Sequence, residues 1–226
     1  MLDLRLYGLI DPDHTDPSLF YSYAQNLARG GVTLIQYRDK KGTTRERIER
    51  ARCLRKALEG FEVPLIINDR VDVCLAAQAH GVHLGQADMD PQDARALLGP
   101  QGLIGLTVTQ KNHMDQAPFS ALSYVSIGAV FPTTSKTNPS SVGLKGLTEL
   151  LTYVRQKAPS LPVCAIAGMN EETIPDACRV GLDGVAVLSA LSTSPHVVET
   201  TRTLRNLVDH SVDSRSTDLK YVSSSL

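Results

Sequence analysis

A cluster of hydrogen-bonding and cationic side chains follows the apolar run VTLIQ, which begins at Val32. Gln36 closes this run, and Arg38 and Lys40 follow at alternate positions. In an extended segment, alternate residues lie on the same side of the chain. Arginine binds phosphate oxygens through a planar fork of N–H groups, and lysine adds a mobile charge. The pattern therefore indicates an anion-binding clamp, with a solvated surface run as the alternative.

Two carboxylates follow the next two apolar runs. Asp69 comes after VPLII, within the sequence Asn68-Asp69-Arg70, and Asp88 comes after GVHL. Two carboxylates facing a phosphate clamp suggest Mg²⁺ held by few protein ligands, water and substrate oxygens. Asp69 could instead cap a helix that starts near Arg70. His83 lies inside GVHL, where we expect a buried, hydrogen-bonded core histidine rather than a ligand.

Later segments could hold a second phosphate. A long loop, GAVFPTTSKTNPSSVGLKG, has Lys136 at its centre, and could cradle an anion or close over the site as a lid. Gly168 follows the seventh run, and Leu188 and Ser189 follow the eighth. No Ser-His-Asp or Cys-His set stands at the ends of the runs. This favours chemistry by positioning and electrostatics over covalent catalysis.

Eight short apolar runs alternate with helical patterns, which predicts a single (β/α)₈ TIM barrel with its chemistry at the carboxyl ends of the strands. A doubly wound open sheet fits less well, because no Gly-rich turn follows the first run. We expect a catalytic domain over residues 1–210 and a flexible Ser-rich tail over 211–226. Helices are predicted over Leu19–Arg29, Thr44–Leu58, Pro91–Leu98, Leu147–Lys157 and Glu171–Arg179.

The composition narrows the functional class. The chain has 226 residues, with 23 Lys and Arg against 24 Asp and Glu, so it lacks the basic excess of a nucleic-acid or membrane-surface binder. No signal peptide or membrane span is recognised in the sequence. Four cysteines without a C-x-x-C pair indicate reduced thiols. We therefore expect a cytoplasmic protein whose partners are small molecules, and association into a homo-oligomer stays open.

Six motifs together resemble the thiamine-phosphate synthase family. They occur in the family's order over roughly residues 4–208, and six spaced matches are far more specific than one. The motifs are QYRDK at 36–40, INDR at 67–70, GVHLGQ at 81–86 with Asp88, GAVFPTTSK at 128–136, AIAGM at 165–169 and GVAVLSAL at 184–191.

The resemblance implies a transferase that joins 4-amino-2-methyl-5-hydroxymethylpyrimidine diphosphate to thiazole phosphate, giving thiamine phosphate and diphosphate. It also implies a role for each matching residue. The pyrimidine diphosphate would be bound by Gln36, Tyr37, Arg38, Asp39, Lys40, Asn68, Thr107 and Lys136, of which Arg38, Lys40 and Lys136 would be catalytic. Mg²⁺ would be held by Asp69 and Asp88. The thiazole phosphate would be bound by Thr133, Thr134, Ser135, Gly168, Leu188 and Ser189.

The chain departs from the family pattern at two places. Thr107 stands where the family usually has serine, and Ala167-Gly168 replaces a pair of glycines. Two other functions remain open: a thiazole tautomerase on the same barrel, and a phosphate-binding protein without activity. The carboxylate pair and Lys136 favour the synthase, because it needs all three.

Overall fold

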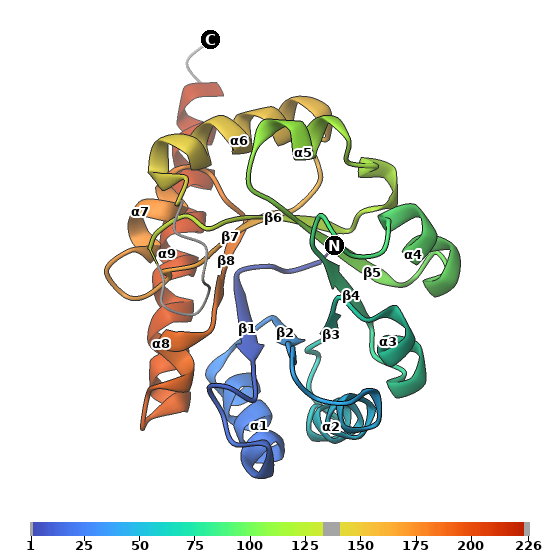
Figure 1. Cartoon of the computed structure of the whole chain (residues 1–226). Coiled ribbons are helices and arrows are strands. Elements are labelled where there is room, and N and C mark those ends of the chain that lie inside the picture. Colours follow the sequence, from blue (N-terminus) through green and yellow to red (C-terminus); the bar gives the residue numbers. More distant parts are fainter. Residues whose placement is uncertain (1, 133–140, 224–226) are drawn as a thin grey trace.

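Eight parallel strands close into one barrel in their chain order (Figure 1). The structure is a computed structural model that describes residues 2–132 and 141–223, with side chains up to residue 213. The predicted TIM barrel is confirmed. The strands are β1 (Leu6–Ile10), β2 (Leu34–Tyr37), β3 (Leu65–Asn68), β4 (Gly81–Leu84), β5 (Leu103–Val108), β6 (Tyr124–Ile127), β7 (Val163–Ile166) and β8 (Gly184–Val187).

The helices form an outer ring around the strands (Figure 1). Each predicted helix is present, with bounds set by local caps; α2, for example, starts after a Thr43–Glu46 capping box. The helices are η1 (Pro17–Leu19), α1 (Phe20–Gly30), α2 (Thr44–Ala57), α3 (Val71–Ala77), α4 (Pro91–Leu98), α5 (Lys111–Asp115), η2 (Phe119–Ala121), α6 (Gly143–Lys157), α7 (Ile174–Arg179), α8 (Ser189–Ser192) and α9 (Val197–Ser223).

Two helix starts differ from the sequence prediction by three residues or more. Helix α6 begins at Gly143 rather than Leu147. Helix α7 begins at Ile174 rather than Glu171, because the residues after Asn170 first form a turn. The Asn170 side chain accepts hydrogen bonds from the backbone N–H groups of Glu172 and Thr173 in that turn. Asn170 therefore organises the entry to α7, as the sequence suggested, without being the residue that precedes it.

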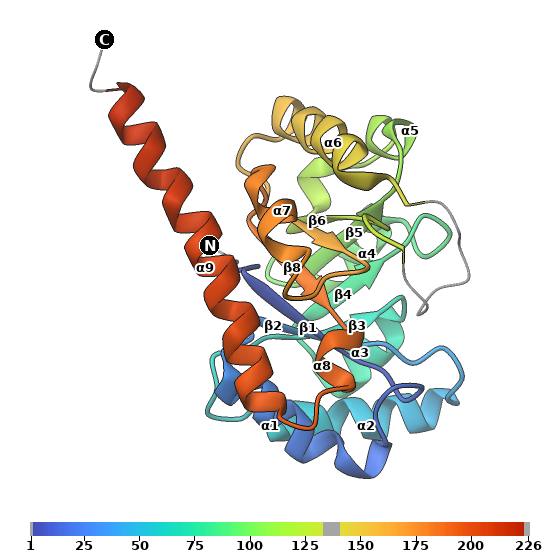
Figure 2. The ribbon, with the colours of Figure 1, turned by 90° about the vertical axis from the view of Figure 1, so that its left-hand side faces the viewer.

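The long C-terminal helix α9 packs against α1 and α7 and runs along one side of the barrel (Figure 2). Its backbone continues beyond Ser211, where the sequence suggested a change to an aperiodic tail. The division into a catalytic domain and a flexible tail at residue 210 stays a prediction. In the described part of the chain, no helix is long and apolar enough to cross a membrane.

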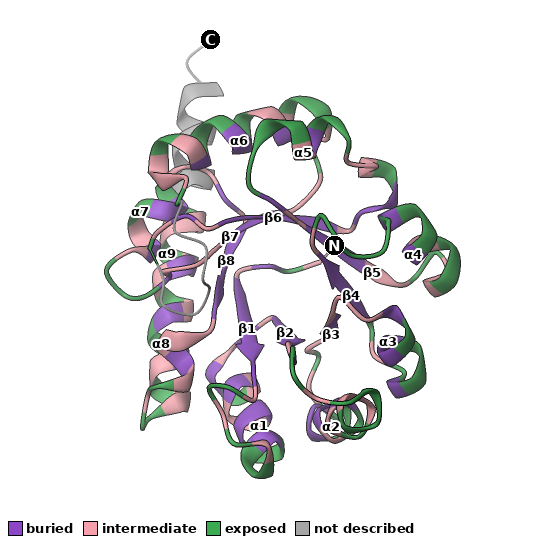
Figure 3. Ribbon diagram, viewed as in Figure 1, coloured by how far each residue is buried: buried purple, intermediate pink, exposed green. Residues whose placement is uncertain are grey.

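Buried residues make up most of the strands and parts of the helices around them (Figure 3). One apolar cluster fills the barrel interior and includes Tyr7, Leu34, Ile66 and Tyr124. A larger cluster packs between the outward faces of the strands and the helices. This division follows from the alternation of side chains along each strand. It leaves the last inward position of each strand free to face the mouth of the barrel.

Candidate active site

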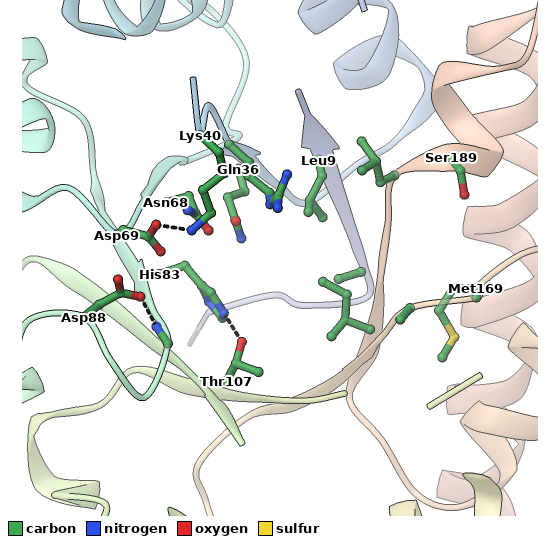
Figure 4. Close-up of a pocket in the computed structure, with 17 residues that line it drawn as sticks. Leu9, Gln36, Lys40, Asn68, Asp69, His83, Asp88, Thr107, Met169 and Ser189 are labelled. Carbon is green, nitrogen blue, oxygen red and sulfur yellow. Dashed lines mark hydrogen bonds and ion pairs between the residues drawn. The ribbon is translucent and has the colours of Figure 1, made fainter. Parts of the chain in front are cut away.

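A cavity of about 300 Å³ opens at the carboxyl ends of the strands (Figure 4). Its volume is sufficient for a small ligand. Polar residues from β2 to β5 line one side, and mostly apolar or small residues from β7 and β8 line the other. The lining residues are Leu9, Gln36, Arg38, Lys40, Asn68, Asp69, His83, Gly85, Asp88, Thr107, Ile166, Ala167, Gly168, Met169, Ala186, Leu188 and Ser189.

Residues 36–40, at the end of β2 and just after it, point alternately to the two sides of the barrel wall. Gln36, Arg38 and Lys40 line the cavity, as their alternate spacing predicted. Tyr37 and Asp39 do not line it. The Tyr37 ring packs edge-on against Phe20 of α1, on the helix side of the wall. Direct contact of Tyr37 and Asp39 with a ligand in this cavity is therefore not supported by the geometry.

Asp39 instead organises the loop that carries Lys40. Its carboxylate accepts hydrogen bonds from the Tyr37 hydroxyl at 2.8 Å and from the Gly42 and Lys41 N–H groups at 2.7 and 3.0 Å. Arg50 of α2 forms an ion pair with the same carboxylate at 2.8 Å. Burial alone would raise the pKa of Asp39, but these hydrogen bonds lower it below its ordinary value. Asp39 is therefore a charged anchor of the loop.

The two predicted metal ligands both line the cavity, at the ends of neighbouring strands β3 and β4. Asp69 forms an ion pair with Lys40, and the Asp88 carboxylate accepts a hydrogen bond from the Gly85 N–H at 2.7 Å (Figure 4). Burial raises the pKa of Asp69, and the nearby Asp88 carboxylate adds to this rise while Lys40 opposes it. An Asp88 carboxylate close enough to disfavour the charge on Asp69 forms with it a suitable pair for a cation.

Asp69 does not cap the following helix. The N-cap position of α3 is Arg70, and no side chain caps that helix. Asp69 itself has a left-handed backbone conformation, with φ of 63°. Such a conformation is uncommon for residues other than glycine and is concentrated at functional sites. The helix-cap alternative for Asp69 is therefore excluded.

Asn68 brings to the cavity an amide group whose nitrogen has no hydrogen-bond partner in the described part of the chain. Its Nδ2 atom is buried, and no partner within the described residues satisfies it. An unsatisfied buried donor is costly, typically about 1–3 kcal/mol, unless a ligand or water accepts from it. The Asn68 amide can therefore donate to a ligand bound in this cavity.

A chain of hydrogen bonds crosses the barrel beneath the cavity. Gln36 Nε2 donates to the Tyr7 hydroxyl at 2.6 Å, and the hydroxyls of Tyr7 and Tyr124 are 2.8 Å apart. His83 continues the chain, with Nδ1 2.9 Å from the Tyr124 hydroxyl and Nε2 2.7 Å from the Thr107 hydroxyl. His83 is therefore buried and hydrogen-bonded, as expected, although its edge also lines the cavity.

The order of donors along the chain is linked to the tautomer of His83. Burial raises the pKa values of Tyr7 and Tyr124, so both phenols stay neutral. If the Gln36 amide donates to Tyr7, then Tyr7 donates to Tyr124 and Tyr124 donates to His83 Nδ1. In that order the proton of His83 lies on Nε2 and is donated to Thr107. The Thr107 hydroxyl then accepts from His83 and keeps its own proton for the cavity. Sequence reasoning missed Tyr7 and Tyr124, because their pairing depends on barrel closure.

The opposite side of the cavity is formed by the ends of β7 and β8. Gly168, Leu188 and Ser189 line it, as predicted. A Cβ atom at Gly168 would lie 2.5 Å from the Phe131 Cβ, and Gly168 has a φ of 69°, so only glycine fits there. Ala167 also has a positive φ, of 79°. The backbone at both positions is therefore glycine-like, and the methyl group of Ala167 is accommodated at the cavity wall.

Four predicted site residues, Thr133, Thr134, Ser135 and Lys136, lie outside the described residues. The remaining site residues of the sequence prediction converge on one cavity, apart from Tyr37 and Asp39. Within the described residues, no three His, Cys, Asp or Glu side chains converge as a complete metal site. A cation here would need oxygens from water or a ligand in addition to Asp69 and Asp88.

The cavity therefore has an anion-binding side with a carboxylate pair and a small-residue side at β7 and β8. Arg38, Lys40 and the Asn68 amide are the donors on the first side. Among the described lining residues, the Thr107 hydroxyl lies beside a histidine, and in the donor order given above it accepts a hydrogen bond from His83. The arrangement is suited to binding a phosphorylated molecule with a divalent cation, beside a second ligand.

Comparisons with known proteins agree with this architecture. Residues 6–191 match the family model described as thiamine monophosphate synthase. The chain is 43% identical over 215 residues to the thiamine-phosphate synthase of Agrobacterium fabrum, covering 95% of this chain and 98% of that one. It is 40% identical over 206 residues to that of Vibrio parahaemolyticus, covering 91% and 98%. The solved thiamine phosphate pyrophosphorylase from Pyrococcus furiosus superposes with a TM-score of 0.81 at 31% identity, covering 93% of this chain and 98% of that one.

Proposed function

Since this chain belongs to the thiamine monophosphate synthase family, whose members make thiamine phosphate, we propose that it joins two phosphorylated substrates within the cavity at the mouth of the barrel. The first is 4-amino-2-methyl-5-hydroxymethylpyrimidine diphosphate and the second is thiazole phosphate. The convergence of the anion-binding residues and the carboxylate pair in one cavity carries this proposal. The products are thiamine phosphate and diphosphate.

The polar side of the cavity receives the pyrimidine diphosphate. Arg38 and Lys40 bind the diphosphate oxygens, and the unpartnered Asn68 amide donates to the same substrate. Lys136 is assigned to the diphosphate on the sequence resemblance alone. Tyr37 and Asp39 act indirectly in this proposal, because the carboxylate of Asp39 holds the loop that presents Lys40.

The carboxylates fit a magnesium ion that arrives with the diphosphate. Asp69 and Asp88 would hold it, and Lys40, the ion-pair partner of Asp69, would also bind the phosphate oxygens. When bound, Mg²⁺ supplies positive charge to the leaving diphosphate. The fit rests on the proximity of the two carboxylates, since the pKa of Asp69 is raised by burial and further by the Asp88 carboxylate.

Neither bond breaking nor bond formation in this reaction requires a residue that removes a proton. The methylene C–O bond of the pyrimidine substrate breaks, and its electron pair leaves with the diphosphate. The aminopyrimidine ring donates electrons to the resulting cationic methylene carbon, which the thiazole nitrogen then attacks to form the new C–N bond. Arg38, Lys40 and Lys136 stabilise the charge that develops on the leaving group. Gly168, Leu188 and Ser189, with Thr133, Thr134 and Ser135, hold the thiazole phosphate.

A reconstituted reaction tests this function. Purified protein with both substrates and Mg²⁺ should release thiamine phosphate and diphosphate in equal amounts, and omitting either substrate should abolish both. Isomerisation of the thiazole without diphosphate release would indicate the tautomerase instead. Binding of both substrates without product would indicate a non-catalytic protein.

Substitutions at Thr107 test the contact of its hydroxyl with the diphosphate. Thr107→Ser should retain nearly all activity, because it keeps the hydroxyl that meets His83. Thr107→Val keeps the shape but loses the hydroxyl, and kcat/KM should fall about ten- to a hundredfold, the usual range for a hydrogen bond to a charged group. Steady-state kinetics of the two variants provide the measurement. Equal activity of the serine and valine variants would show that Thr107 only packs.

A further inference from the structure

Arg38, the arginine of the diphosphate clamp, is held from behind by a buried carboxylate. Its guanidinium forms an ion pair with Asp11, the residue that follows β1. Asp11 is only 1% exposed, and its carboxylate also accepts a hydrogen bond from the Asp13 N–H at 2.9 Å. The carboxylate is therefore fixed to its own loop as well as to Arg38.

The barrel backbone keeps the two residues together. Strands β1 and β2 are paired through Ile10 and Tyr37, and the Arg38 N–H donates to the Ile10 carbonyl at 2.9 Å. Asp11 and Arg38 thus follow directly from paired positions on neighbouring strands. The ion pair therefore connects the first residues after two hydrogen-bonded strands.

Asp11 is placed to act on Arg38 rather than on a ligand. Arg38 lines the proposed substrate cavity and Asp11 does not. Asp11 lines a second, polar cavity, together with Lys40, Asp39, Lys41 and Arg50. A guanidinium carries five N–H donors in one plane, so a bond to Asp11 leaves others for phosphate oxygens. The carboxylate therefore sets the orientation of that plane without occupying the substrate side.

The ion pair with Asp11 would weaken anion binding if Arg38 contributed only its charge. A buried carboxylate cancels part of the attraction between Arg38 and an anion. The Asp11 carboxylate also holds the Arg38 side chain in one orientation before a ligand binds. Arg38 therefore loses less conformational entropy when it binds the ligand. We propose that Asp11 is a positioning residue that aims the Arg38 guanidinium at the diphosphate. This inference rests on the proposed function, in which Arg38 binds that group.

A double-mutant cycle tests the inference. Asp11→Asn keeps the shape and an acceptor oxygen but removes the charge. In the otherwise unchanged enzyme, kcat/KM for the pyrimidine diphosphate should fall about tenfold, whereas KM for thiazole phosphate should stay constant. In an Arg38→Ala background, Asp11→Asn should change kcat/KM less than about twofold, because the residue through which it acts is gone. If activity there is too low to measure, calorimetric Kd values for diphosphate with Mg²⁺ complete the same cycle.

Asp13→Asn is the matched control. Asp13 lies on the same loop and pairs with Lys41 at 2.8 Å, but both side chains are largely exposed and neither lines the substrate cavity. Its kcat/KM should stay within about twofold of the parent value, as expected for a surface pair. Equal losses from Asp11→Asn in both backgrounds, accompanied by a lower Tm, would overturn the inference and leave Asp11 a purely structural residue.

Arg38→Lys provides a second approach if Asp11→Asn does not fold. Lysine keeps the charge and can still meet Asp11, but it lacks the planar fork. The proposal predicts about a tenfold loss of kcat/KM, and full activity of Arg38→Lys would contradict it.

The outcomes also separate the proposed function from the proposed role of Asp11. A wild-type protein that makes no thiamine phosphate contradicts the proposed function, whereas an active enzyme that is insensitive to Arg38→Ala overturns only the clamp and the role of Asp11.

Discussion

Replacing Asp69 or Asp88 by asparagine is expected to lower kcat by about a hundred- to a thousandfold, the scale of losing one preorganised electrostatic contact to a transition state. Each change keeps the side-chain shape and an oxygen atom but removes the charge that attracts a cation. The two residues lie at the ends of neighbouring strands, and the pKa of Asp69 is raised by burial and by Asp88. Steady-state kinetics at saturating substrate and Mg²⁺ measure the effect.

Stability should change little in the same variants. Asparagine, like aspartate, tolerates the left-handed conformation of residue 69. The lost ion pair with Lys40 is partly solvent-exposed and contributes less than about 1 kcal/mol. Asp72→Asn is the control, since Asp72 lies nearby on α3, is exposed and does not line the cavity. A variant at Asp69 or Asp88 that melts much lower yet keeps its kcat would identify a structural acid instead of a ligand.

Lys136→Ala is expected to lower kcat by a similar factor, about a hundred- to a thousandfold, because its ammonium group would no longer stabilise the leaving diphosphate. The effect on kcat should exceed the effect on KM for thiazole phosphate, which identifies an interaction made in the transition state. Lys136→Arg should also be poor, because a planar guanidinium does not replace a compact ammonium group. Initial rates over a range of both substrates provide the measurement.

Lys145→Ala is the matched control for this loop. Lys145 lies in the first turn of α6 and is exposed, so its removal should leave kcat unchanged. If Lys136→Ala retains the wild-type kcat, Lys136 is a solvated loop residue and the stabilisation of the diphosphate must come from Arg38 and Lys40.

The barrel and most of the cavity could be predicted because both depend on short-range patterns. The apolar runs identify the strands, and parallel strands in a barrel place their carboxyl ends at one mouth. Gln36, Arg38, Asn68, Asp69 and Asp88 then reach the same cavity without any further assumption. The resemblance to a known family added the identity of the substrates, which spacing alone does not supply.

Tyr37 and Asp39 show how a motif can be over-interpreted. The alternation that places Arg38 and Lys40 on one side also places Tyr37 and Asp39 on the other, where they bond to each other. Applying the alternation to the whole segment would have excluded them from the cavity. Asp11 could also have been found, because it ends the first run as Asp69 ends the third. Its pairing with Arg38 depends on the register of β1 and β2.

The hydrogen-bonded chain through Tyr7, Tyr124 and His83 could not be predicted in the same way. Its members come from β1, β6 and β4, and they meet only because the barrel closes with a particular register. Gly105 of β5 makes room for it, since a Cβ atom there would lie 2.1 Å from the Tyr124 ring. No local pattern links a glycine to a tyrosine on the next strand.

Calorimetric titration of Mg²⁺ tests the central claim, that metal and diphosphate are bound together by this cavity. With two carboxylates as the only protein ligands proposed, the remaining ligands must be water and diphosphate oxygens. Mg²⁺ should therefore bind weakly to the protein alone and at least about tenfold more tightly when the pyrimidine diphosphate is present, a coupling in the usual range for linked ligands. Titration of the diphosphate without protein corrects for Mg²⁺ bound in solution. The coupling should disappear in Asp69→Asn and Asp88→Asn and persist in Asp72→Asn. Equal Mg²⁺ affinity with and without the diphosphate, or a coupling that survives the loss of both carboxylates, would contradict the account.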